Sequence, residues 1–350
     1  MAIQKSRIQK SLVYSLCHMY SRLRVNNVSY QSEGCKLYTA RNVSLIGYYG
    51  IAIQSPGVLI TKLFAKPQSL AKIISQHYSI GSFFSAMLTP FKNKVHSNKK
   101  ITYDNIFHLV ARHGPDIDTP NYAHWMLENL PLIHCYLKQP QDTKLLIRAS
   151  APAWIYETLT TLGVCKDKIV EAGSDIYCRN LIFCDLPYIH SNEYIHCKVH
   201  RHWLSKAMKS KCIVNKKEKN RRIFLSRQTS RRRKIQNFDE FEKLMQEFGI
   251  DVIDTSAHTV CQQVAIFHNS AFVLSQSGAA LSNMLFMNKG AKVMEIKNVE
   301  KNSSTWCWEE LAKEMGHRYY SYDISTDAGR HSDILIDIDI LKSELKKVLS

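Results

Sequence analysis

Short apolar runs alternate with amphipathic segments along the second half of the chain. The runs are rich in Val, Ile, Phe and Tyr, as strands are, and the segments between them repeat their apolar positions every three or four residues, as helices do. The predicted strands are 222–225, 250–253, 271–275, 292–296 and 318–322, and the predicted helices are 238–248, 260–267, 279–287, 306–315 and 339–349. Alternation at this spacing predicts a parallel, doubly wound α/β sheet.

The first half of the chain is less regular. Short strands are predicted at 145–147, 169–170 and 181–183, among helices. A length of 350 residues is enough for two medium-sized domains. We predict an N-terminal α/β domain over 1–205, a basic linker over 206–221 and a C-terminal α/β domain over 222–350.

The net charge of +17 is concentrated in one stretch. Between Lys206 and Lys234 there are thirteen Lys or Arg against the single Glu218, a charge run typical of a solvated linker in its first half. A nucleic-acid-binding protein would interleave aromatic side chains with its basic ones, and this stretch holds only Phe224. The pattern argues against nucleic acid as a partner.

The N-terminal 24 residues combine basic side chains with apolar positions at helical spacing. Such a helix lies on an anionic membrane surface or packs on its own domain, and the pattern fits both. No apolar run approaches the roughly 20 residues of a membrane span, and the start lacks the features of a signal peptide. The ten scattered cysteines are predicted to be free thiols. We expect a cytoplasmic protein, with peripheral attachment to the inner face of the membrane as an option.

The segment 277–283 follows an apolar run and has the pattern of a strand that meets a glycine and opens a helix. Gly278 lets the backbone approach a ligand closely, and the helix that follows offers N–H groups and a favourable dipole to an anion. An open α/β sheet binds phosphate at such a place, although an ordinary strand-to-helix turn has the same pattern. The candidate binding residues are Ser277, Gly278, Ala279, Ala280, Leu281, Ser282 and Asn283.

A second candidate lies at the end of an upstream strand. Ser226 and Arg227 end the strand at 222–225, and a loop then carries three arginines and a lysine before Asn237, a plausible N-cap for the next helix. Fixed guanidinium groups at a strand end are suited to neutralising a pyrophosphate. Each arginine taken singly also fits a solvated basic loop.

Residues 121–134 carry another dense set of polar side chains. On a helix, Asn121, His124 and Glu128 share one face, because they are spaced by three and four residues. A histidine with a carboxylate four residues on is a candidate general base held in one tautomer, or a hydrogen-bond donor to phosphate. The alternative is a His–Glu surface pair beside a packing tryptophan.

Metal binding has weaker support. Asp-x-Asp strings occur at 116–118, in a loop with glycine and prolines, and at 337–339, where the last helix is predicted to begin. Histidines between 190 and 202, His200 among them, lack a paired ligand spacing and are interpreted as solvent-facing. No metal site is predicted.

Three motifs occur in the order and at the spacings of glycosyltransferase family 61, which the chain resembles over roughly 103–349. They are Asn-x-x-His-Trp-x-x-Glu-x-Leu-Pro at 121–131, Ser-Arg at 226–227 followed by Arg-Lys-x-x-Asn-x-x-Glu at 233–240, and Gly-Ala-x-Leu-x-Asn-x-x-Phe at 278–286. The chain also resembles bacterial members described as capsular polysaccharide biosynthesis proteins. It departs from the family pattern at Ser277, where a histidine is common, and at Phe238, where a glutamate is common.

The resemblance implies a GT-B fold, in which two Rossmann-like domains face a cleft and the C-terminal one holds the nucleotide. It implies transfer of a sugar with inversion, without a bound metal or other cofactor, from a nucleotide sugar, usually UDP-linked, to a glycan or lipid-linked glycan acceptor. On the matching positions, Arg227, Arg233 and the 278–283 turn hold the diphosphate, while His124 and Glu128 line the cleft. The other candidate binding residues are Asn121, Ser226, Asn237 and Ser277.

Two functions remain from different classes. An inverting glycosyltransferase that builds a surface or capsular polysaccharide would use Glu128 or His124 to take the acceptor proton, with a slight preference for Glu128, and Arg227 with Arg233 to stabilise the leaving group. The alternative is a noncatalytic basic protein that binds nucleic acid or anionic membrane. The scarcity of aromatic side chains in the basic stretch favours the enzyme.

Overall fold

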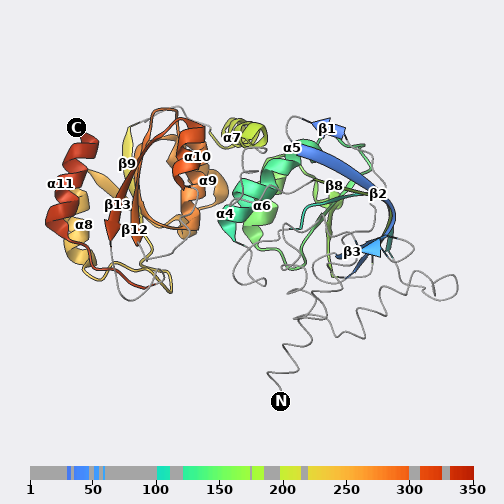
Figure 1. Ribbon diagram of the computed structural model, residues 1–350, viewed down its shortest axis with the longest axis horizontal. Coiled ribbons are helices and arrows are strands. Elements are labelled where there is room, and N and C mark those ends of the chain that lie inside the picture. Colours follow the sequence, from blue (N-terminus) through green and yellow to red (C-terminus); the bar gives the residue numbers. More distant parts are fainter. Residues whose placement is uncertain are drawn as a thin grey trace, which may run out of the picture. The chain divides into compact units, whose positions relative to one another are not determined.

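The computed structural model (Figure 1) describes residues 30–32, 35–46, 51–54, 58–59, 101–110, 121–173, 176–184, 198–213, 220–298, 308–324 and 332–350. The chain divides into two compact units, Met1–His200 and Arg201–Ser350, and each is described by itself. Residues 206–212, predicted as linker, are instead the end of helix α7 (Lys198–Cys212). The predicted amphipathic helix over 1–24 and the Asp-x-Asp string at 116–118 lie outside the described residues.

The second unit is built on a five-stranded sheet with the order β10-β9-β11-β12-β13. Its strands are β9 (Arg221–Leu225), β10 (Ile250–Ile253), β11 (Ser270–Gln276), β12 (Lys292–Asn298) and β13 (Arg318–Ile324). Every neighbouring pair is parallel, which confirms the sheet predicted for this half of the chain. The direction in which strands are added reverses between β9 and β11, and open α/β sheets bind ligands outside the carboxyl ends of the strands at such a switch point.

Helices connect these strands and cover both faces of the sheet (Figure 1). They are α8 (Phe238–Glu247), α9 (Val260–His268), α10 (Trp308–Met315) and α11 (Ile338–Leu349), with a short 3-10 turn η6 (Thr255–Ala257). The segment after β11, predicted as an ordinary helix, is the 3-10 helix η7 (Ala279–Phe286). Thr259 forms a capping box at the start of α9. Asp337 caps α11, which confirms that the Asp-x-Asp string at 337–339 begins the last helix.

One face of this sheet packs against α8 and α11. Phe272 and Leu274 of β11 join Phe241 of α8 and Leu345 of α11 in one buried cluster. Successive side chains of a strand point to opposite faces, so Ser275 lies on the other face of the sheet. This apolar face fixes the register of the strands, because a slip of one residue would expose it.

The first unit holds an eight-stranded mixed sheet with the order β4-β3-β2-β8-β5-β6-β7, and β1 pairs with β2. The strands are β1 (Tyr30–Ser32), β2 (Cys35–Ile46), β3 (Ile51–Gln54), β4 (Val58–Leu59), β5 (Ile101–His108), β6 (Lys144–Ile147), β7 (Ile169–Glu171) and β8 (Ile176–Cys184). The pairs among β8, β5, β6 and β7 are parallel, and the pairs that involve β2 or β3 are antiparallel. The α/β class is confirmed, while the GT-B arrangement stays a prediction.

The helical segments of the first unit are short. They are α4 (Tyr122–His124), the π-helical turn η2 (Trp125–Asn129), the 3-10 turns η3 (Leu130–Leu132) and η4 (Lys166–Lys168), α5 (Ile133–Tyr136) and α6 (Ala153–Thr161). In the part of the chain that the structure describes, no helix of either unit combines the length and the apolarity needed to cross a bilayer.

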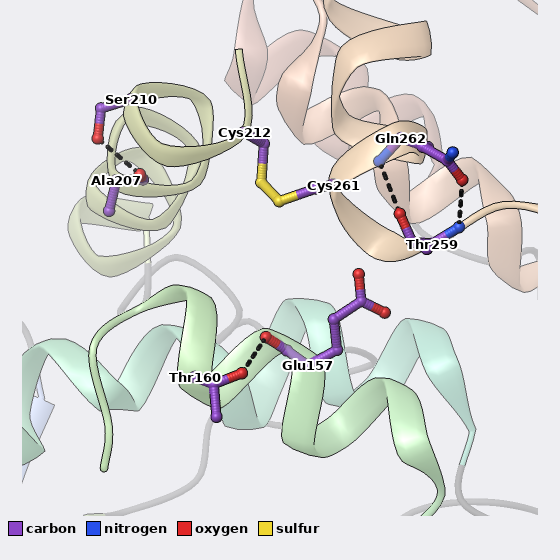
Figure 2. Close-up of a disulfide and its surroundings, with 8 residues drawn as sticks. All are labelled: Glu157, Thr160, Ala207, Ser210, Cys212, Thr259, Cys261 and Gln262. Carbon is purple, nitrogen blue, oxygen red and sulfur yellow. Dashed lines mark hydrogen bonds between the residues drawn. A yellow bond between two sulfur atoms is a disulfide. The ribbon is translucent and has the colours of Figure 1, made fainter. Parts of the chain in front are cut away.

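A disulfide joins Cys212, at the end of α7, to Cys261 in the first turn of α9 (Figure 2). For these two residues the expectation of free thiols is wrong. Cys135, Cys165 and Cys178 are free thiols, as expected. Disulfides persist mainly in oxidising compartments, so this bond removes one ground for the cytoplasmic location, which stays a prediction.

Candidate active site

The loops after β9 and β11 leave the sheet side by side at its carboxyl edge. The two strands are adjacent and parallel, with Leu225 of β9 level with Ser275 of β11. The residues that follow them are Ser226–Arg227 on one side and Ser277–Gly278 on the other. The two motifs predicted to bind a diphosphate therefore lie together at the switch point of the sheet.

Arg227 packs against Gly278, and this contact explains the glycine. A Cβ atom on Gly278 would lie 2.7 Å from Arg227 Nη1. The Gly278 backbone is extended, with a φ of −174°, so the glycine serves close approach rather than a left-handed turn. Arg227 is half-buried, burial lowers the pKa of its guanidinium, and its Nε has no hydrogen-bond partner among the described residues. A bound anion would stabilise a desolvated cation of this kind.

Arg233 reaches the same turn from the loop after β9. Its Nη1 donates a hydrogen bond to the carbonyl oxygen of Ser277, and its backbone is left-handed, with a φ of 60°. Non-glycine residues rarely adopt this conformation, so other contacts must hold the loop. Gln228 provides two, because its Nε2 donates to Ile235 O and its Oε1 accepts from Ile235 N, both at 3.0 Å. The arginines at 231–232 are exposed, as the solvated-loop alternative expects for them.

A buried carboxylate lies beside Ser277. Glu295 of β12 accepts hydrogen bonds from the hydroxyl groups of Ser277 and Tyr319. Burial, the largest cause, raises the pKa of Glu295, while both hydrogen bonds act in the opposite direction. Glu295 was not among the candidates from the sequence, although an acid within the apolar run of a predicted strand is a signal for a partnered group.

Two predicted binding residues have partners within the protein. Asn237 lies at the N-cap position of α8 without a capping bond, and instead donates to Ile336 O at 2.9 Å and accepts from Ile336 N at 3.0 Å. Asn283 is buried and donates to Gln263 Oε1 at 2.8 Å. These contacts give both asparagines a structural part in holding the site. Of the remaining turn residues, Leu281 and Ser282 are buried, and Ala279 and Ala280 are half-buried.

The first unit brings His124 and Glu128 together. His124 Nδ1 lies 3.1 Å from Glu128 Oε2, as the four-residue spacing predicts. The surface-pair alternative is wrong, because His124 is 7% and Glu128 1% exposed. Asn121 caps α4, where its Oδ1 accepts from Ala123 N at 2.9 Å and from His124 N at 3.4 Å. Asn121 therefore fixes the start of the helix that carries His124.

The helix that carries this pair passes through a π-helical turn at Trp125–Asn129, where Leu130 N donates to Trp125 O. Single π-helical turns occur frequently at functional sites. The Trp125 ring is fully buried, and its Nε1 donates to Thr158 Oγ1 of α6 at 3.0 Å. This anchor holds the turn in place from within the core.

Within the described ranges, no three His, Cys, Asp or Glu side chains are grouped so that they could hold a metal ion. His200, interpreted from the sequence as solvent-facing, is instead buried, with its Nδ1 3.0 Å from His134 Nδ1. Cys135 Sγ lies 3.9 Å from His200 Nε2. A hydrogen bond with Cys184, ahead of the contact with His200, lowers the pKa of Cys135 to about 5.

Comparison with known proteins places these motifs in one family. Residues 122–294, which run from α4 to β12, match the sequence model described as Glycosyltransferase 61. An alignment over 112 residues, which covers 29% of this chain, shows 29% identity to the EGF domain-specific O-linked N-acetylglucosamine transferase of Xenopus laevis. The match spans 21% of that relative's length. Residues 122–294 thus match glycosyltransferase family 61, a family of sugar-transferring enzymes.

Proposed function

We propose that this protein is an inverting, metal-independent glycosyltransferase. It transfers a sugar from a nucleotide donor, UDP-linked, to a glycan or lipid-linked glycan acceptor of a surface or capsular polysaccharide. The observation that carries the proposal is the contact of Arg227 and Arg233 with the Ser277–Gly278 turn at the β9/β11 switch point. Two fixed cations at this edge of a doubly wound sheet match the charge of a nucleoside diphosphate.

The arginines stabilise the departing diphosphate. As the bond between the sugar C1 and the diphosphate oxygen breaks, negative charge grows on the leaving group, and preorganised cations lower the energy of that state. Arg227 supplies an Nε without a hydrogen-bond partner in the described part of the chain. This charge is available without a metal, which is the basis for proposing a metal-independent reaction.

His124, in place of the Glu128 that is slightly preferred from the sequence, is the general base in this proposal, and Glu128 positions it. A carboxylate accepts hydrogen bonds, so the 3.1 Å approach of Glu128 Oε2 to His124 Nδ1 supports a tautomer with the proton on Nδ1 and the Nε2 lone pair available as the base. The acceptor hydroxyl oxygen attacks C1, its proton passes to Nε2, and the diphosphate leaves in a single displacement that inverts C1. Glu128 acting directly as the base is the alternative.

The donor sugar is proposed from the Xenopus laevis relative, whose name describes N-acetylglucosamine transfer. The test is nucleotide release from a panel of UDP-, GDP-, CMP- and dTDP-sugars, with and without a chelator. Release from UDP-N-acetylglucosamine that the chelator leaves unchanged would support the donor and the metal independence. Release that needs an added divalent cation would contradict the metal-independent reaction, and silence across the panel would contradict the enzyme.

The noncatalytic alternative is not favoured. Two of the four arginines at 227–233 turn toward Ser277–Gly278 instead of forming a solvated basic surface. Attachment to an anionic membrane through residues 1–24 and a cytoplasmic location remain proposals. Membrane co-sedimentation of the chain, with and without residues 1–24, tests the first of these.

A further inference from the structure

Gln276 is a buried amide at the edge of the proposed donor site. It is the last residue of β11, directly before Ser277–Gly278, and only 2% of it is exposed. Neither its Nε2 nor its Oε1 has a hydrogen-bond partner among the residues that the structure describes. Leaving a buried amide unsatisfied is costly, so an unpaired amide at the edge of a ligand site needs an explanation, and a bound molecule supplies one.

The strand pattern places Gln276 on one face of the sheet. It stands two residues after Leu274 and four after Phe272, so it shares their face, which α8 and α11 cover. It is level with Ile296, a member of the same cluster. Ser277 and Glu295 have their hydrogen bond on the opposite face. Gln276 is therefore a polar residue on the apolar face of the sheet, next to the Ser277–Gly278 turn that is proposed to bind the diphosphate.

The loop that carries the arginines also borders this face. Ile235 belongs to the cluster that contains Leu274, and it forms a bridge with Ile334. On β9, Leu225 is level with Ser275, so Ser226 follows next to Gln276. The amide thus lies beside the strand end that delivers Arg227, with apolar side chains around it.

We propose that Gln276 binds the base of the donor nucleotide, and this inference rests on the proposed function. An amide presents one donor and one acceptor side by side, which matches the donor–acceptor edge of a nucleobase. The arginines at the neighbouring strand end suit the diphosphate of the same nucleotide. In this proposal Gln276, at the end of β11, recognises the base, and the adjacent Ser277–Gly278 turn binds the diphosphate.

The test compares UDP with ribose 5-diphosphate, which lacks the base, in calorimetric titrations of the full chain. Gln276→Leu should weaken UDP binding by about 10- to 100-fold and leave ribose 5-diphosphate binding unchanged. Gln276→Met, which keeps the length of the side chain, is the second variant and should behave alike. Equal affinity of UDP for the wild type and both variants would overturn the inference and leave the proposed function standing.

Two further outcomes separate the claims. If Gln276→Leu weakens both ligands equally, the amide does not contact the base, and the inference fails. If the wild type binds neither ligand, the proposed function fails and the inference falls with it.

Thermal unfolding without ligand tests independently whether the Gln276 amide has a partner within the protein. Gln276→Leu removes an unsatisfied amide and should raise Tm by about 2–4 °C. The matched control is Gln263, a buried glutamine whose Nε2 donates to Thr255 O at 2.9 Å and whose Oε1 accepts from Asn283. Gln263→Leu should lower Tm. A fall in Tm for both variants would assign Gln276 to the fold and overturn the inference.

Discussion

His124 and Glu128 form a buried pair, so each can be tested by a single substitution. His124→Ala should lower kcat by about 10²- to 10⁴-fold with a small change in KM, because a general base acts in the transition state. Glu128→Gln should lower kcat less, since Gln keeps the shape and loses the charge that orients the imidazole. Initial-rate kinetics of sugar transfer measure both.

His202 provides the matched control for this pair, because it is an exposed histidine on α7. His202→Ala should leave kcat and KM at wild-type values. A larger loss for Glu128→Gln than for His124→Ala would assign the base to Glu128 and contradict the role proposed for His124.

Glu295 makes the stability of the second unit depend on pH. Burial raises its pKa above the ordinary value of 4.5, so the folded state binds the proton more tightly than the unfolded state. The contribution to stability is full below pH 4.5 and is lost as pH rises toward the raised pKa. Glu295→Gln mimics the protonated acid and should flatten Tm against pH in this window. An unchanged slope would contradict the shift.

The two kinds of site contact differ in how well the sequence predicts them. The His124–Glu128 pair follows from helical spacing, since residues four apart are neighbours on a helix. The contacts of Ser277, Glu295 and Tyr319 depend on which strands are adjacent, a property of the whole sheet. Gln276 becomes a candidate binding residue only because its amide is buried and has no hydrogen-bond partner among the described residues. Neither property can be read from the sequence.

At the ends of β9 and β11, the coupling of Arg227 and Gly278 can be measured. Gly278→Ala places a Cβ 2.7 Å from Arg227 Nη1, so the flexible end of the arginine must move. We expect UDP affinity to fall about tenfold with little loss of stability, because no left-handed backbone is involved. Added to Arg227→Ala, the same change should have little further effect. Full additivity in the titrations would show that the two residues act independently.

The strands of the second unit were predictable because each is a short apolar run in a sheet covered on both faces. β2 and β5 of the first unit were not predicted, because their apolar residues do not form a continuous run. In β2 the buried Tyr38, Ala40, Val43 and Leu45 are separated by polar or half-exposed residues, so no continuous apolar run exists. β7 at Ile169–Glu171 confirms the strand predicted at 169–170, whereas β8 extends well beyond 181–183.

At the scale of the whole molecule, the longest-range covalent link among the described residues is the Cys212–Cys261 disulfide. It joins the end of α7 to α9, and both cysteines belong to the second unit. Cys212→Ser should lower the free energy of unfolding by about 2–4 kcal/mol, because the crosslink restricts the unfolded chain. Denaturant unfolding with and without reductant measures this loss. Cys165→Ser, which changes an exposed free thiol, should have no such effect. Equal stability of wild type and Cys212→Ser under oxidising conditions would contradict a stabilising bond.

The switch-point site for a nucleoside diphosphate is tested most directly by calorimetric titration of UDP into the full-length protein. Arg227 is half-buried against Gly278, whereas Arg231 of the same loop is exposed, so the two arginines form a matched pair. The predicted result is binding to the wild type and to Arg231→Ala, with about 10- to 100-fold weaker binding to Arg227→Ala. Equal affinities for the two variants, or no binding to the wild type, would contradict the site.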